Sequence, residues 1–256
     1  MLTRTQIQRL AQRNGIGMQT QERDYVQHLL LYLLYSPVVP NRRSQDLIFK
    51  GGTALRIVYR GNRYSEDLDF NGPADLDALK AFWQIISKSL SSFGVMSEIR
   101  NEWTSEVGYS LDVSFQGPLF DGRDRSKGKV RVDVNCRQEI VDTQRVLVSS
   151  DYDDLRPFVV TSISLEHMLA EKARALLTRG KPRDLYDLWL LNQQGVRFDV
   201  NLANQKLALY KLEFSQALLE NAFEQVRADW ERDLRPLLPQ FVAWEDVVRQ
   251  INISKG

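Results

Sequence analysis

Cysteine is almost absent from the chain, which has one, Cys136, in 256 residues. One cysteine cannot form an intramolecular disulfide, so the sequence excludes a disulfide-stapled scaffold and indicates a reducing compartment. Long apolar runs are also missing, since the longest, Leu29 to Leu34, is too short to span a bilayer. Three arginines lie between Met1 and Arg13 without a signal-peptide core after them. We therefore expect a cytoplasmic protein with no membrane partner.

A large net charge is absent as well. The formal net charge is +1, with 43% hydrophobic and 26% charged residues, which is ordinary globular usage and excludes a globally basic coat for nucleic acid. Any RNA would have to bind local basic clusters, although solvated loop charge explains each cluster equally well. The clusters are Arg123, Arg125, Lys127, Lys129 and Arg131, and then Lys172, Arg174, Arg179, Lys181 and Arg183.

The order of periodic segments predicts an α+β (mixed α/β) protein with a small mixed sheet flanked by helices. Apolar spacing predicts helices and alternation predicts strands. Expected helices cover 3–35, 51–60, 76–93, 165–177, 182–192 and 204–230; expected strands cover 47–50, 65–70, 98–102, 109–116 and 129–137. Helices alone follow residue 150, so we place a boundary near residue 155. It separates a domain over 1–155, which begins with helices, from a helical domain over 156–256.

Paired carboxylates are the first candidate site. If 65–70 is a strand, its period of two places Ser65, Asp67 and Asp69 on one face and Leu68 and Phe70 on the other. Two carboxylates held that close repel unless a cation lies between them. Oxygen ligands of this kind suit Mg²⁺ or Mn²⁺, which also bind triphosphate oxygens.

A third carboxylate has two candidates. Asp133 lies between Val132 and Val134 and should face away from the core, while Asp112 lies between Leu111 and Val113. Three converging acids can hold two metal ions, one activating a hydroxyl and the other stabilising a leaving pyrophosphate. The pattern leaves open whether Asp133 or Asp112 supplies the third group.

A glycine turn precedes the paired acids by one helix. After Phe49 and Lys50, the pair Gly51 and Gly52 lets backbone N–H groups approach an anion at a helix start. Thr53 can donate a hydrogen bond to a phosphate oxygen or cap the helix. A Gly-Gly turn used only for steric reasons is the alternative.

Lys172 occupies a core-facing position, because it shares one helical stripe with Leu165, Met168, Leu169 and Leu176. Its stem can reach solvent; a buried ammonium instead needs an anion, either a carboxylate or a triphosphate. The next helix offers Asp187, which is also four residues from Arg183, and a salt bridge that only locks the helices competes with a functional role. Asp184, on the adjoining face, is the alternative functional acid.

Together these residues resemble the AbiE-type (AbiEii) nucleotidyltransferase toxins, within the polymerase-beta-like nucleotidyltransferase superfamily. The resemblance covers roughly residues 47–192 and rests on separated motifs. They are Lys50-Gly51-Gly52-Thr53-Ala54-Leu55, Arg63-Tyr64-Ser65-Glu66-Asp67-Leu68-Asp69-Phe70, Val132-Asp133-Val134, and Lys172 with Arg179 and Arg183-Asp184-Leu185-Tyr186-Asp187-Leu188.

The resemblance implies a role for each motif. It implies metal binding by Asp67 and Asp69, phosphate contact by Gly52, Thr53 and Ser65, triphosphate contact by Lys172, and catalytic assistance from Asp184 or Asp187. The residue pattern adds Asp133 as the candidate third metal ligand and Gly51 and Arg183 as candidate nucleotide contacts. Thr53 stands where the family often has serine, which leaves the nucleotide preference open.

The resemblance also implies a function: a toxin of a toxin–antitoxin or abortive-infection (phage-defence) system that adds NMP from an NTP to the 3′ end of tRNA and blocks translation, opposed by a cognate antitoxin. Candidate RNA contacts are Arg123, Arg125, Lys127, Lys129, Arg179 and Lys181. Two alternatives remain at this point: nucleotidylation of a protein Ser or Tyr, and an inactive domain that only binds nucleotide or a partner.

Overall fold

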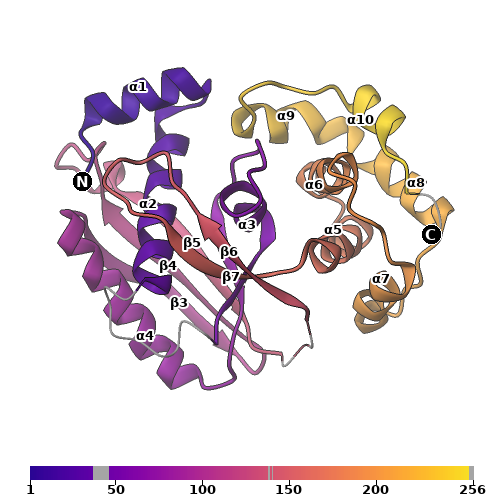
Figure 1. Cartoon of the computed structure of the whole chain (residues 1–256), viewed down its shortest axis with the longest axis horizontal. Coiled ribbons are helices and arrows are strands. Elements are labelled where there is room, and N and C mark those ends of the chain that lie inside the picture. Colours follow the sequence, from indigo (N-terminus) through magenta and orange to yellow (C-terminus); the bar gives the residue numbers. More distant parts are fainter. Residues whose placement is uncertain (37–45, 138, 140, 254–256) are drawn as a thin grey trace. The chain divides into compact units, whose positions relative to one another are not determined.

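The computed structural model describes residues 1–36, 46–137, 139 and 141–253. The chain divides into two compact units, residues 1–162 and residues 163–256, and each buries apolar side chains of its own. Figure 1 colours the first unit from indigo to pink and the second from orange to yellow. The boundary expected near residue 155 lies before the last strand of the first unit and remains a prediction.

The first unit combines helices with one mixed sheet. Its elements are α1 (Arg4–Asn14), α2 (Met18–Tyr35), β1 (Ile48–Lys50), α3 (Gly51–Ile57), β2 (Asp67–Asn71), α4 (Leu76–Ser89), β3 (Met96–Ser105), β4 (Gly108–Gln116), β5 (Gly128–Asn135), β6 (Thr143–Val148) and β7 (Phe158–Ile163). Within the described residues the strand order is β3-β4-β5-β2-β1-β7-β6. The pairs β2–β5 and β1–β7 are parallel, while β1–β2, β3–β4 and β4–β5 are antiparallel. The predicted mixed sheet is confirmed.

Alternation along the central strands produces one apolar and one polar face. Leu68 and Phe70 of β2 and Val132 and Val134 of β5 are at most 2% exposed. Helices α2 and α4 pack against the sheet and appear beside it in Figure 1. Asp67 and Asp69 therefore lie on the face opposite to this packed core.

Several boundaries in the first unit differ from the sequence predictions. Strand β2 begins at Asp67, so Ser65 precedes it. Helix α3 ends at Ile57 instead of residue 60. Arg60 itself has a positive φ of 56°, which lies outside the helical range. Strands β6 and β7 were not predicted: β6 exposes Leu147, which breaks a simple inward-apolar pattern.

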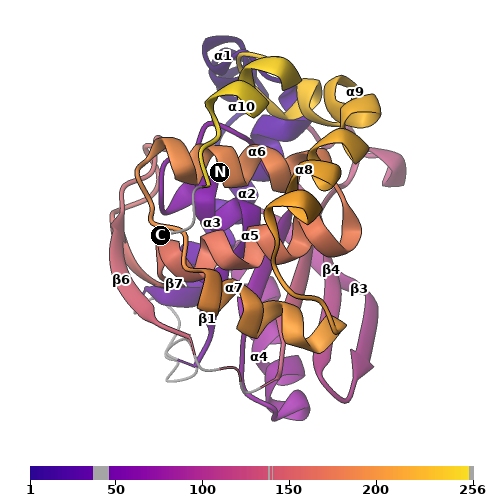
Figure 2. The same ribbon diagram turned by 90° about the vertical axis from the view of Figure 1, so that its right-hand side faces the viewer.

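The second unit is helical, as predicted. Its helices are α5 (Leu165–Arg179), α6 (Pro182–Gln193), α7 (Val200–Leu207), α8 (Gln216–Gln225), α9 (Trp230–Leu234) and α10 (Trp244–Gln250). Figure 2 labels each of them. The single helix expected over 204–230 is wrong. It is broken after α7, where Lys211 has a φ of 57°, and Ser215 caps a new helix by accepting a hydrogen bond from Leu218 N. None of the helices described here has the length and apolar character needed to cross a bilayer.

Candidate active site

Strand register brings the predicted acids together on the polar face of the sheet. Asp69 of β2 is the direct partner of Asp133 on the parallel strand β5, and Asp67 pairs with Arg131 in the same register. All three aspartates are half-buried. Adjacent strands lie about 4.8 Å apart, so Asp69 and Asp133 project from neighbouring positions.

The same register decides which rival acid lies beside β2. Asp112 of β4 pairs with Arg131 of β5, so it is one strand further from β2 than Asp133 is. Asp112 is only 3% exposed; its Oδ2 accepts a hydrogen bond from Asn101 Nδ2 at 2.8 Å and lies 3.4 Å from Lys129 Nζ. The geometry therefore favours Asp133 as the third carboxylate, held by the Ser110 hydroxyl and by Arg131 Nε at 3.1 Å.

The glycine turn lies directly against these acids. Gly51 has a φ of +78°, and a Cβ built on it would collide with the Asp69 carboxylate. Its backbone can approach Asp69 only because the side chain is missing. Lys50, the last residue of β1, is the register partner of Asp69. The predicted link between the turn and the Asp-x-Asp strand is thus present in the fold.

Thr53 and Ser65 join the same cluster in different ways. The Thr53 hydroxyl donates to the backbone carbonyl of Asp67, so its predicted hydrogen bond to a phosphate oxygen would require a change of partner. A Cβ on Gly52 would come within 2.8 Å of Ser65 Oγ. Ser65 therefore lies beside the turn although it is outside the strand.

Arg63 is a site residue that reasoning from the sequence missed. It is 3% exposed, and its guanidinium occupies the space that a Cβ on Gly52 would enter. A buried guanidinium at a glycine turn suits phosphate recognition, because its planar fork matches phosphate oxygens. The sequence offered one signal for Arg63, namely its position two residues before Ser65 in the motif that runs from Arg63 to Phe70.

The donor set fits a hard divalent cation together with a triphosphate. Mg²⁺ is usually held by one or two carboxylates plus substrate phosphates, and Asp67, Asp69 and Asp133 offer carboxylate oxygens beside the glycine turn. In the part of the chain described here, no group of three or more His, Cys, Asp or Glu side chains is arranged to hold a metal ion. A cation at these carboxylates would need further ligands, such as phosphate oxygens of the substrate.

The motif residues of the second unit form a buried network of opposite charges. Lys172 is 6% exposed, and Asp184 and Asp187 are 0% and 1% exposed. Lys172 Nζ lies 2.7 Å from Asp187 Oδ2 and 3.9 Å from Asp184 Oδ1. Arg179 donates two hydrogen bonds of 2.7 Å to Asp184. The predicted burial of Lys172 is confirmed, and Arg183 is half-buried on the same helix as the two acids.

Residues 32–250 match the family described as "Nucleotidyl transferase AbiEii toxin, Type IV TA system". The chain belongs to this family. It is an AbiEii nucleotidyltransferase toxin of a type IV toxin–antitoxin system, and the family match extends beyond the motifs over 47–192 at both ends.

Two solved structures share the fold of this AbiEii toxin. MenT4, a nucleotidyltransferase toxin from Mycobacterium tuberculosis, is 21% identical with a TM-score of 0.68, covering 97% of this chain and 88% of that one. JHP933 from Helicobacter pylori is 16% identical with a TM-score of 0.61, covering 92% of this chain and 89% of that one. No curated protein shows a significant match.

The first basic cluster of the AbiEii toxin is only partly available for RNA. Lys127 Nζ lies 2.9 Å from both Glu98 and Asp124. Arg123 and Arg125 are exposed, and Arg123 Nε is 3.9 Å from Asp121. In the second cluster Arg179 contacts Asp184, whereas Lys181 is exposed at the start of α6. Cys136 is buried, and burial raises the pKa of its thiol.

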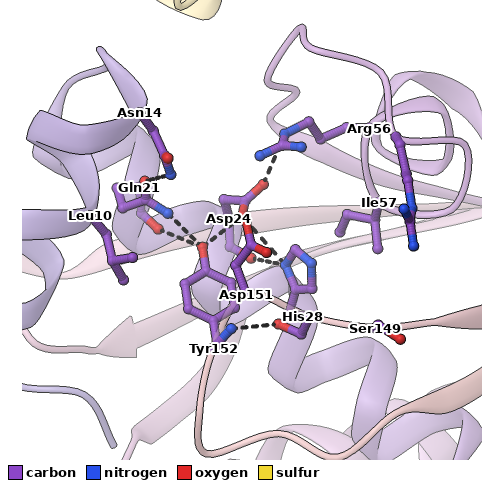
Figure 3. A pocket seen from close by; sticks show the side chains of 12 residues that line it. Leu10, Asn14, Gln21, Asp24, His28, Arg56, Ile57, Ser149, Asp151 and Tyr152 are labelled. Atoms are coloured by element: carbon purple, nitrogen blue, oxygen red, sulfur yellow. Dashed lines mark hydrogen bonds and ion pairs between the residues drawn. The ribbon is translucent and has the colours of Figure 1, made fainter.

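A polar cavity of about 330 Å³ lies near the C-terminal end of α3, in the same unit as the glycine turn. Figure 3 shows Asp24 at its centre. Asp24 accepts a 2.6 Å hydrogen bond from Tyr152 Oη and lies 3.7 Å from Arg56 Nε. Burial, and then the neighbouring Asp24 carboxylate, raise the pKa of Tyr152 well above its usual value, so the phenol stays a donor. These contacts connect α2, α3 and residue 152 and so hold the helix that carries the turn.

Proposed function

We propose that this AbiEii toxin transfers NMP from an NTP to the 3′ end of an RNA, namely tRNA, and so blocks translation. The observation that carries the proposal is the register pairing of Asp69 with Asp133 beside Gly51. Acids crowded at a glycine turn suit a triphosphate and its cation. An abortive-infection role and a cytoplasmic location follow from the same proposal.

Asp67, Asp69 and Asp133 would hold Mg²⁺ or Mn²⁺. When bound, the cation would neutralise charge on the triphosphate and on the leaving pyrophosphate. Gly51 and Gly52 would bring backbone N–H groups to the phosphates, and Ser65 and Arg63 would contribute side-chain donors. The predicted roles of Lys172, Asp184, Asp187 and Arg183 in binding and catalysis remain predictions.

The reaction is an in-line displacement at the α-phosphorus. The 3′ hydroxyl oxygen of the acceptor forms a bond to that phosphorus, and its proton passes to a carboxylate of the set. The bond from the α-phosphorus to the α–β bridging oxygen breaks, and pyrophosphate leaves with the electron pair. Little covalent work falls to the protein, so rate enhancement comes from positioning and charge stabilisation.

RNA is the acceptor favoured by the exposed basic side chains of the first unit. Membership of a type IV toxin–antitoxin family supports a cognate antitoxin as the protein partner. Label appearing on a Ser or Tyr of a protein would instead identify the second candidate acceptor, and binding without transfer would identify an inactive module.

The test is to incubate the protein with labelled NTPs, Mg²⁺ and total tRNA, and to compare wild type with Asp69→Asn. We expect labelled tRNA from wild type and a loss of at least about a thousandfold in the variant. Several kcal/mol of charge stabilisation would be lost with the metal ligand, and each 1.4 kcal/mol changes the rate about tenfold.

Asp77→Asn is the matched control, because Asp77 is an exposed aspartate in the first turn of α4 and undergoes the same change of charge. It should label tRNA at the wild-type rate. Absence of labelled RNA with all four nucleotides, or equal labelling by Asp69→Asn, would exclude the proposed reaction.

A further inference from the structure

A second cavity of the first unit, about 420 Å³ in volume, has a strongly basic lining. It is bounded by the start of α1, the first turns of α2 and the chain leading into β5. Five basic residues line it against two acidic ones: Arg4, Arg23, Arg125, Lys127 and Lys129 against Glu22 and Asp121. The cavity therefore has an excess of positive charge in a chain whose net charge is only +1.

Five basic and two acidic lining residues leave a formal excess of three positive charges. Glu22 is 4% exposed, and its Oε1 accepts a 2.6 Å hydrogen bond from Leu119 N. Burial raises the pKa of the Glu22 carboxyl, and the hydrogen bond from Leu119 and the charge of Arg4 oppose that rise. The Asp121 carboxylate accepts a 3.0 Å hydrogen bond from the backbone N–H of Arg123. The cavity is thus an electropositive site suited to an anion.

The basic residues fall into two groups. Arg23 pairs with Glu66, Lys127 with Glu98 and Asp124, and Lys129 with Asp112. Arg4 and Arg125 are exposed, and within the described ranges neither has a carboxylate oxygen within 4 Å, although the charge of Arg4 acts to lower the pKa of both Glu22 and Asp121. Arg4 makes one long hydrogen bond of 3.4 Å to the Leu119 carbonyl. These two guanidinium groups are the ones ready to bind a phosphate.

Two lining residues of the cavity, Arg23 and Lys129, lie close in the fold or the chain to the strands that carry the acids. Arg23 contacts Glu66, which directly precedes Asp67. Lys129 lies two residues before Arg131, the register partner of Asp67. A strand whose 3′ end lies at the acids can therefore have its preceding phosphates at this cavity.

We infer that this cavity binds backbone phosphates of the acceptor RNA just upstream of its reacting 3′ end, with Arg4 and Arg125 as the contacting residues. The inference rests on the proposed function, because it assigns the acceptor side of that site. Contacts to phosphates place a strand without reading its sequence. Arg4 and Arg125 are accordingly positioning residues for the acceptor.

The test measures labelling of total tRNA by the double variant Arg4→Ala/Arg125→Ala over a range of RNA and salt concentrations. We expect the KM for RNA to rise about tenfold with the KM for NTP unchanged. Loss of two phosphate contacts should also reduce the slope of log affinity against log salt by about 1.4, at about 0.7 per contact for a single strand. A thermal melt checks that the variant is folded.

Arg9→Ala is the matched control, since Arg9 is exposed on the same helix and is not part of the cavity lining. It should leave the KM for RNA and the salt slope at wild-type values. Wild-type labelling of tRNA with an unchanged KM and salt slope in the double variant would overturn this inference alone. Failure of the wild-type protein to label any RNA would overturn the proposed function and the inference together.

Discussion

Asp69 of the first unit and Asp187 of the second are both aspartates of the predicted site motifs, but their surroundings differ. Asp69 is half-buried, faces Asp133 across a strand pair and touches Gly51. Asp187 is 1% exposed and lies 2.7 Å from the ammonium of Lys172. Asp69 and Asp133 are register partners in the sheet, and Arg131 Nε lies 3.1 Å from Asp133, whereas Asp187 is buried against a lysine that is itself buried. The same residue type therefore lies half-buried beside a glycine turn in one unit and fully buried in an ion pair in the other.

The largest expected effect concerns the helical network. Lys172→Met should lower the free energy of unfolding by about 3–5 kcal/mol, because it leaves Asp187 as an uncompensated buried charge. Urea denaturation measures the change. Lys181→Met, an exposed change of the same charge in the same unit, should stay within about 0.5 kcal/mol. Equal stability of both variants would show that the ion pair of Lys172 with Asp187 does not stabilise the helical unit. The contrast drawn between the two aspartates would then be wrong.

A smaller effect is expected at the glycine turn. Gly51→Ala should cost about 1–3 kcal/mol and most of the transfer activity, because the new methyl group meets the Asp69 carboxylate at a positive φ. Gly122→Ala isolates the backbone contribution, since Gly122 has a φ of +90° with no atom within 4 Å of an added Cβ. If both substitutions have the same effect on activity, close approach to Asp69 is not what the turn requires.

The smallest expected effect concerns the neighbouring acids of the sheet. Without metal, Asp69→Asn should raise the free energy of unfolding by less than about 1 kcal/mol, because like charges directly opposite in a sheet repel. Thermal melts in EDTA and in Mg²⁺ measure it: the ion should stabilise wild type and leave the variant almost unchanged. A variant that melts lower than wild type in EDTA would contradict the repulsion.

Much of the sheet and most of its acid cluster followed from periodicity. Leu68 and Phe70 alternate with Asp67 and Asp69, and Val132 and Val134 flank Asp133, so each strand specified its own faces. The pairing of Asp69 with Asp133 could not be read in this way, because it depends on which strands become neighbours. Asp133 and Asp112 stayed alternatives in the sequence, and the strand register is what places Asp133 beside Asp69.

Other features depended on contacts that no local pattern encodes. Arg63 gives no periodic signal, and its place against Gly52 arises from the path of the chain between α3 and β2. The end of α7 at Leu207 also escaped prediction, because the residues over 204–230 keep an amphipathic pattern across a turn at Lys211. Arg4 was noted only as part of a basic N-terminal segment, and the fold brings it beside the residues that lead into β5.

The bond from the Thr53 hydroxyl to the Asp67 carbonyl joins the glycine turn to the acid-bearing strand through a contact within the chain. Preorganised sites lose little freedom when substrate arrives. Under the proposed function, the phosphate-binding turn is therefore ordered before the substrate arrives.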